Sequence, residues 1–162
     1  MSEDEGRKPD TRLHTIAGRW QTSGHVIDKP EIPVAGTDTY EVLPGGYFLV
    51  HHVDVTVGDK PVRAIEIIGE PDAVSGGFLA RSFDNDGNTE LMRVTIDGGG
   101  VFHFNGGPEV ASAAQPTDAP TARVRSRLTI AEDGQSMTAL WERSDDGTNW
   151  QRWMDISFRR SD

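Results

Sequence analysis

A few polar residues stand out in this sequence because they interrupt segments of alternating apolar residues. His51 and His103 could serve as acid–base groups or metal ligands, because imidazole titrates near neutral pH. Glu66 could act as a general base. Arg152 could anchor a carboxylate or stabilise developing negative charge. Each of these roles requires that the fold turns the side chain toward a bound molecule.

The elements that must position these residues are short strands. The chain has 162 residues with 18 glycines and 9 prolines, and Val plus Ile outnumber Leu, which favours strands and turns over helices. Turns containing Gly and Asp separate the β-branched runs, and no segment keeps a helical period. We predict strands at residues 18–27, 37–43, 47–57, 62–69, 77–83, 89–97, 101–105, 122–131, 136–144 and 149–160.

Short strands in consecutive hairpins predict an all-β fold, a roughly ten-stranded antiparallel up-and-down β-barrel with an internal cavity. A β-sandwich is the alternative. We expect one barrel domain over residues 13–160, preceded by a disordered polar tail at residues 1–12. Two long connections are expected: residues 28–36, which hold two prolines, and a flexible loop at residues 106–121.

The registers of the last hairpins predict one continuous apolar face. A four-residue turn at residues 145–148 would place Trp141 opposite Arg152 and would put Met154 on the same face. A buried cation needs a partner. Arg152 would therefore form an internal salt bridge, lie at the barrel rim, or anchor a ligand carboxylate.

Alternation also predicts the faces of the histidines. In the strand that begins at Tyr47, His51 should point inward and His52 outward. A two-residue turn at Gly98-Gly99 would place His103 on the inner face with Met92. Each inward histidine is either simply packed and hydrogen-bonded or touches a ligand. The face of Glu66 is not determined, because both alternations in its strand are partly apolar.

Composition excludes several classes of partner and site. With 26 acidic and 16 basic side chains the net charge is −10, so no nucleic acid is expected. No apolar stretch approaches 18 residues, so no membrane partner is expected. The absence of cysteine excludes disulfides and suits a cytoplasmic location. We expect no metal site and no catalytic nucleophile. Arg125 should pair with Glu142 on a solvated outer wall.

Several motifs resemble those of known barrels. Gly18-Arg-Trp20 resembles the Gly-x-Trp start of calycins, the group of lipocalins, fatty-acid-binding proteins and nitrobindins. With the segments at residues 43–49, 83–87 and 146–150, the chain looks like an uncharacterised bacterial family of lipocalin-like barrels. This resemblance implies a ten-stranded barrel with a cavity. It implies no activity, because that family has no settled activity.

The resemblance to nitrobindins is more distant. Nitrobindins ligate haem through a histidine near the C-terminal end of the barrel, whereas the last histidine here is His103. Haem would therefore need His51 or His103, and we expect no cofactor.

The leading hypothesis is a protein that binds a small, partly apolar and, given Arg152, anionic molecule inside the barrel. Its partner would be a hydrophobic or amphipathic ligand. The expected ligand-binding residues share an inward face or an aromatic or sulfur-containing side chain: Trp20, Tyr47, His51, Met92, His103, Trp141, Arg152 and Met154.

Two alternatives involve chemistry in the same cavity. One is a cofactor-free isomerase, cyclase or hydratase in which His51 or Glu66 is the general base and Arg152 stabilises negative charge. The other is haem binding. In addition, Trp153 on the outer face suggests a self-association patch, and hence a homodimer.

Overall fold

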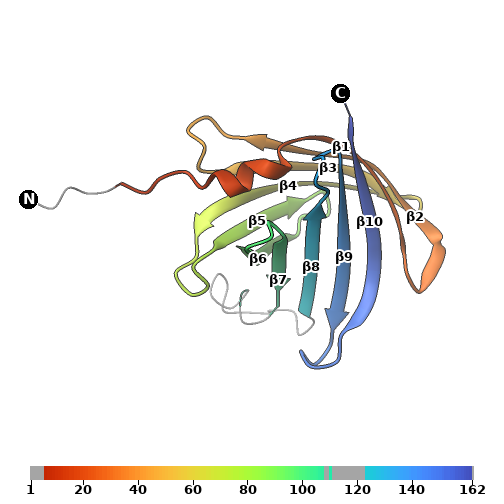
Figure 1. The fold of residues 1–162 in the computed structure, drawn as a ribbon. Helices are drawn as coiled ribbons and strands as arrows, with labels where there is room; N and C mark the ends of the chain where they lie inside the picture. Colours follow the sequence, from red (N-terminus) through yellow and green to blue (C-terminus); the bar gives the residue numbers. More distant parts are fainter. Residues whose placement is uncertain (1–5, 108–109, 111–122, 162) are drawn as a thin grey trace, which may run out of the picture.

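The computed structural model, which describes residues 6–107, 110 and 123–161, is a closed antiparallel β-barrel (Figure 1). Each of its ten described strands pairs with its neighbours in sequence, and β1 closes the barrel against β10. This confirms the expected all-β up-and-down barrel. The strands are β1 (Gly18–Val26), β2 (Lys29–Val42), β3 (Leu49–Val57), β4 (Lys60–Pro71), β5 (Phe78–Asp84), β6 (Thr89–Ile96), β7 (Phe102–Gly106), β8 (Arg123–Ile130), β9 (Ser136–Ser144) and β10 (Gln151–Ser161).

β2 begins earlier than the sequence patterns predicted. Residues 28–36 were expected to be a connection because of their prolines, but β2 starts at Lys29. Pairing with β3 begins only at Val34, and of residues 29–33 only Lys29 and Pro33 have a partner in β1. The ladder is therefore incomplete around Pro30 and Pro33, where a missing N–H is tolerated. The expected flexible loop at 106–121 lies, apart from residues 106, 107 and 110, outside the described residues.

A short 3-10 helix, η1 (Thr11–Ile16), covers one end of the barrel (Figure 1). It buries Leu13 and Ile16 against Trp20, which is fully buried. The indole Nε1 of Trp20 donates to the carbonyl of Ile16 at 3.0 Å. Arg160 lies over the Trp20 ring at 4.2 Å, an attractive cation–π geometry. The Gly18-Arg-Trp20 motif thus supplies a buried indole that helps to close this end of the barrel.

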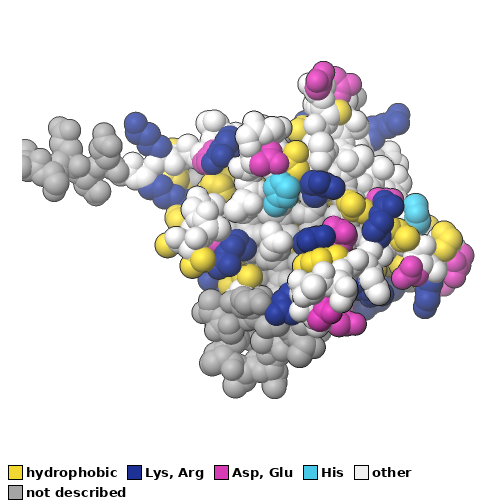
Figure 2. Space-filling model, turned by 60° about the horizontal axis from the view of Figure 1, so that its bottom comes forward, with side chains coloured by type: hydrophobic (Ala, Val, Ile, Leu, Met, Phe, Trp, Pro, Cys, Tyr) yellow, Lys and Arg dark blue, Asp and Glu magenta, His cyan; other side chains and the backbone are white. Residues whose placement is uncertain are grey.

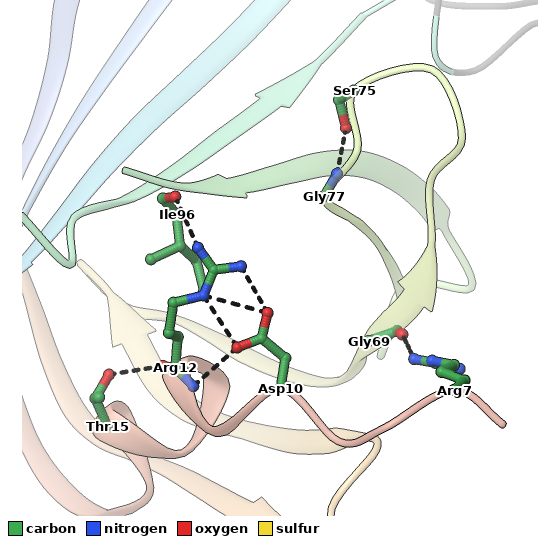
Figure 3. A network of polar contacts seen from close by, with 8 residues as sticks. All are labelled: Arg7, Asp10, Arg12, Thr15, Gly69, Ser75, Gly77 and Ile96. Atoms are coloured by element: carbon green, nitrogen blue, oxygen red, sulfur yellow. Dashed lines mark hydrogen bonds and ion pairs between the residues drawn. The ribbon is translucent and has the colours of Figure 1, made fainter. Parts of the chain in front are cut away.

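Residues in and just before η1 are hydrogen-bonded to the same end (Figure 3). Arg12 donates to Asp10 at 2.6 Å and to the carbonyl of Ile96 at 3.4 Å. Arg7 donates to the carbonyl of Gly69, and its own carbonyl accepts from the hydroxyl of Tyr47 at 2.7 Å. Part of the segment that we expected to be disordered therefore contacts the barrel, and residues 1–5 lie outside the described residues.

Large side chains fill the half of the barrel beside η1. The largest fully buried ones are Trp20, Phe102, Leu13, Ile16, Leu49, Ile68, Met137 and Val94. Several of the strand residues among them lie near the ends that approach η1, since Leu49 and Phe102 start their strands and Ile68 lies near the end of β4. Close packing of this half leaves the remaining interior space in the other half.

The outer surface is charged and mixed in sign. On the face seen in Figure 2, basic and acidic side chains are interspersed. The predicted cross-strand pair is confirmed, because Arg125 lies opposite Glu142 and donates to it at 2.9 Å. None of the helical segments in the described residues is both long and apolar enough to cross a membrane.

Candidate functional site

The unfilled half of the barrel contains a cavity of about 260 Å³. Most of its wall is apolar, and valines from β2, β3 and β4 face aromatic and aliphatic side chains from β7 to β10. The lining residues are Thr22, Val34, Asp38, Tyr40, His51, Val53, Val55, Val57, Val62, Glu66, Phe104, Ser126, Leu128, Ala139, Trp141, Met154, Ile156 and Phe158.

One wall of this cavity carries a hydrogen-bonded polar group of residues. His51 lies in register with Tyr40 on β2 and with Glu66 on β4, so all three point to the same face. Its Nε2 lies 2.6 Å from Asp38 Oδ1, and its Nδ1 lies 3.0 Å from Glu66 Oε1. Thr22 Oγ1 donates to the other oxygen of Asp38. We call Asp38, His51 and Glu66 the inner triad.

The position of His51 between two acceptors determines its charge state. Burial by itself would lower the pKa of His51, but the hydrogen bonds to Asp38 and Glu66 outweigh burial and raise the pKa to about 9. At neutral pH the ring is therefore an imidazolium that donates on both sides. Two carboxylates and one imidazolium leave the inner triad with one net negative charge.

Tyr40 covers one face of the imidazolium. The two rings are stacked with centroids 3.9 Å apart and planes inclined by 10°. Burial and the neighbouring charges of Asp38 and Glu66 raise the pKa of Tyr40 well above its usual value. Tyr40 therefore presents a neutral hydroxyl to the cavity.

Several polar atoms of the cavity wall have no hydrogen-bond partner in the part of the chain that the structure describes. They are Glu66 Oε2, the hydroxyl of Tyr40 and the hydroxyl of Ser126, a residue with only 4% of its surface exposed. Ser126 on β8 lies five strands from His51 on β3, on the opposite wall of the ten-stranded barrel. Among the described residues, every fully enclosed side-chain nitrogen or oxygen atom is paired. The three unpaired atoms are therefore open to the cavity and available to a bound molecule.

The structure brings three of the predicted ligand-binding residues together at this cavity: His51, Trp141 and Met154. Trp20 lies in the closed end and Met92 is buried in the core, and neither lines the cavity. Tyr47 is half-buried beside the segment that leads to η1.

The predicted inward face of Arg152 is wrong. Arg152 lies opposite Glu142, on the outer face. Met154 lies opposite Trp141, on the inner face. Trp153 is therefore the extra residue of a β-bulge. Because of this extra residue, Arg152 points outward although Met154, two positions later, points inward.

Arg152 is exposed at the surface, whereas the ring of Trp153 lies against Trp141 of the cavity lining. Arg152 is 59% exposed at its side chain and lies 3.3 Å from Asp155. Trp153 is half-buried, with its ring edge-on to Trp141 at 6.3 Å and Arg143 over it at 5.4 Å.

The predicted inward face of His103 is also wrong. The turn spans three residues, because Asp97 N donates to the carbonyl of Val101. His103 therefore pairs with Thr95, one position away from the expected register, and points outward. Its Nε2 lies 2.9 Å from Asp97 Oδ2. A difference of one residue in the turn exchanges the inner and outer faces for every side chain of β7.

Sequence analysis missed Asp38 and Thr22 and left the face of Glu66 open. The alternation of Val34, Asp38 and Tyr40 along β2 was a usable signal, because all three are buried on the inner face. The prolines of residues 28–36 hid only Val34, because they favour a connection where β2 in fact starts, whereas Asp38 and Tyr40 lie within the strand predicted at residues 37–43. The face of Glu66 follows only from its register with His51.

Neither of the two histidines considered for haem offers a free ring nitrogen to the cavity. An axial histidine needs a free ring nitrogen, but both nitrogens of His51 are hydrogen-bonded to carboxylates and His103 lies outside the barrel. No group of three or more His, Cys, Asp or Glu side chains that could hold a metal ion is found among the described residues.

Fold and site define the class of this protein as a closed ten-stranded β-barrel with a partly apolar internal cavity. Within that class, residues 5–160 match the family described as "Protein of unknown function (DUF1579)", so the chain belongs to that family. No match was found among curated proteins.

Solved structures are similar to this chain at low sequence identity. The crystal structure of Rv2717c from M. tuberculosis is 14% identical, covers 96% of this chain and 100% of its own, and superposes with a TM-score of 0.58. A de novo designed fluorescence-activating β-barrel is 14% identical, with 94% and 99% coverage and a TM-score of 0.49. The redesigned barrel mFAP1, solved with DFHBI bound, is 14% identical, with 93% and 100% coverage and a TM-score of 0.43.

Proposed function

We propose that this protein binds a small, largely apolar molecule in the barrel cavity, with the polar end of that molecule against the inner triad. The observation that carries the proposal is the combination of an apolar cavity with polar wall atoms that have no partner in the described chain. Ligand sites commonly combine an apolar lining with a few orienting polar groups. The argument for an anionic ligand depended on Arg152, which lies outside the barrel, so it no longer holds.

The cavity limits the size of the ligand. Its volume of about 260 Å³ lies just under the ~300–1,000 Å³ that is typical of sites for drug-sized ligands. A molecule with one ring and a short chain suits this space better than a long fatty acid or a tetrapyrrole.

A probe of this size tests the proposal. We expect 3-phenylpropan-1-ol to bind in isothermal titration calorimetry and to raise the melting temperature. Ala139→Phe should abolish binding, because Ala139 lines the cavity and a phenyl ring there would fill it. Thr138→Phe is the matched control, since Thr138 is the exposed neighbour on the outer face. Equal binding by both variants would place the probe elsewhere and refute the proposal.

A second candidate is a cofactor-free enzyme that moves protons in the same cavity. It is favoured by the free Oε2 of Glu66 beside a charged His51, which together offer a base and an acid. Exchange of the α-protons of 4-phenylbutan-2-one in D₂O, followed by NMR, tests it. Exchange should be faster with the wild-type protein than with Glu66→Gln. Equal rates for wild type, variant and buffer would dismiss this candidate.

Three broader expectations remain proposals. These are a kinship with calycins, suggested by Gly18-Arg-Trp20, a cytoplasmic location, and a homodimer formed through Trp153. Light scattering coupled to size-exclusion chromatography of wild type and Trp153→Ser tests the homodimer, which would require a larger mass for the wild type.

A further inference from the structure

We infer that the cavity selects molecules whose polar end is a protonated amine, held by the free oxygen of Glu66. This inference rests on the proposed function and names the class of ligand. Three observations carry it: the charge of the cavity wall, the hydrogen-bonding character of its free atoms, and the distribution of the apolar surface.

The wall of the cavity is negative. Asp38 from β2 and Glu66 from β4 face it with His51 from β3 between them, and its described lining contains no Lys or Arg. Ser82 and then Glu90 continue the row from Glu66 across β5 and β6, so the next charged group on this face is also acidic. A second anion in this space would be repelled by the net negative charge of the inner triad, and low-polarity surroundings strengthen charge interactions.

The free carboxylate oxygen of the wall requires a donor. A carboxylate oxygen accepts hydrogen bonds and cannot donate them. Glu66 Oε1 is already occupied by His51 at 3.0 Å, so Oε2 is the oxygen left for a ligand. The Glu66 side chain is only 14% exposed, and a buried carboxylate oxygen is best matched by a charged N–H donor. An alcohol could donate to it as well, but without compensating the charge.

Apolar surface also lies across the cavity from this carboxylate. Leu128, Trp141 and Met154 belong to β8, β9 and β10, on the far side of the barrel from β4. A ligand that places an ammonium group at Glu66 therefore projects its apolar part toward these side chains. Ser126 lies on the same far wall and could meet a further polar atom. The overall charge of −10 also favours the approach of cations.

Three molecules of equal length test the inference: 3-phenylpropan-1-amine, 3-phenylpropan-1-ol and 3-phenylpropanoate, titrated calorimetrically at pH 7. We expect the amine to bind at least about tenfold more tightly than the alcohol, and the carboxylate to bind most weakly. Glu66→Gln should remove the advantage of the amine over the alcohol. Glu41→Gln removes the same charge from the exposed outer side of β2 and should keep that advantage.

The outcomes separate the inference from the proposed function. If no member of the series binds, the proposed function fails together with the inference. If the alcohol binds as tightly as the amine, or the carboxylate binds best, the cavity binds small molecules and the inference alone is overturned. The ranking in the wild type stands even if Glu66→Gln does not fold.

Discussion

Asp38 Oδ1 and His51 Nε2 lie 2.6 Å apart on neighbouring strands, although the two residues are not directly opposite in the sheet. Their contact is diagonal, a spacing that long or aromatic side chains can bridge. Both side chains are almost fully buried, 7% and 11% exposed. This hydrogen bond secures the imidazolium in an otherwise apolar wall, and it links the stability of the barrel to pH.

The free energy of unfolding should fall as pH rises from about 6.5 to about 9. The pKa of His51 is raised to about 9 in the folded protein, so the folded state binds more protons than the unfolded state in this window. The stabilisation is fully present below the unfolded pKa near 6.5 and is lost as pH passes 9. The change is on the order of 3 kcal/mol. Urea unfolding at several pH values measures it, and His51→Gln should flatten the profile.

Asp38→Asn should lower the pKa of His51, because a neutral amide replaces the charged acceptor nearest the ring. We expect a decrease of at least about one pH unit. An NMR titration of the imidazole protons measures it directly. Asp54→Asn is the control, because Asp54 is exposed on the outer face of β3 and pairs with Arg63. An unchanged titration in Asp38→Asn would contradict the charge assigned to the inner triad.

Gly36→Ala should destabilise the barrel by about 1–3 kcal/mol or more. A Cβ at Gly36 would lie 2.2 Å from the backbone oxygen of Asp54, and Gly36 has a φ of +153°. Gly98→Ala is the control, since nothing lies within 4 Å of a Cβ there. Urea unfolding should place Gly98→Ala within about 0.5 kcal/mol of the wild type. If both variants lost a similar amount of stability, the close contact between Gly36 and the backbone of β3 would not be the cause.

Deletion of Trp153 should leave a folded barrel. Trp153 is the extra residue of the bulge, so its removal keeps Arg152 opposite Glu142 and Met154 opposite Trp141. Deletion of Ser157, which lies in a regular part of β10, would reverse the alternation of one end of that strand and should prevent folding. Circular dichroism and NMR spectra distinguish the two results. Equal tolerance of both deletions would argue against register as the reason.

Arg152→Ala should leave stability and probe binding unchanged. The side chain is exposed and pairs with Asp155 at the surface, and surface ion pairs contribute about 0–1 kcal/mol. Urea unfolding and titration with 3-phenylpropan-1-amine check both points. Loss of probe binding would return Arg152 to the ligand site.

How much of the site was predictable depends on how local the deciding interactions are. The inward face of His51 followed from alternation within one strand, and the Arg125–Glu142 pair followed from one hairpin. Asp38 and Glu66 could not be placed beside His51 from sequence, because their contacts join β2, β3 and β4 through the registers of two hairpins.

The sequence by itself predicted ten strands and the up-and-down barrel, because turn residues and β-branched alternation act over a few residues. Only the tertiary structure decided which polar side chains enter the cavity. Strands have a period of two, so one extra residue at Trp153 turned Arg152 outward and one extra residue in the turn before Val101 turned His103 outward. The cavity is therefore lined by Asp38 and Glu66 around His51, and not by Arg152, the cationic anchor that the sequence patterns predicted.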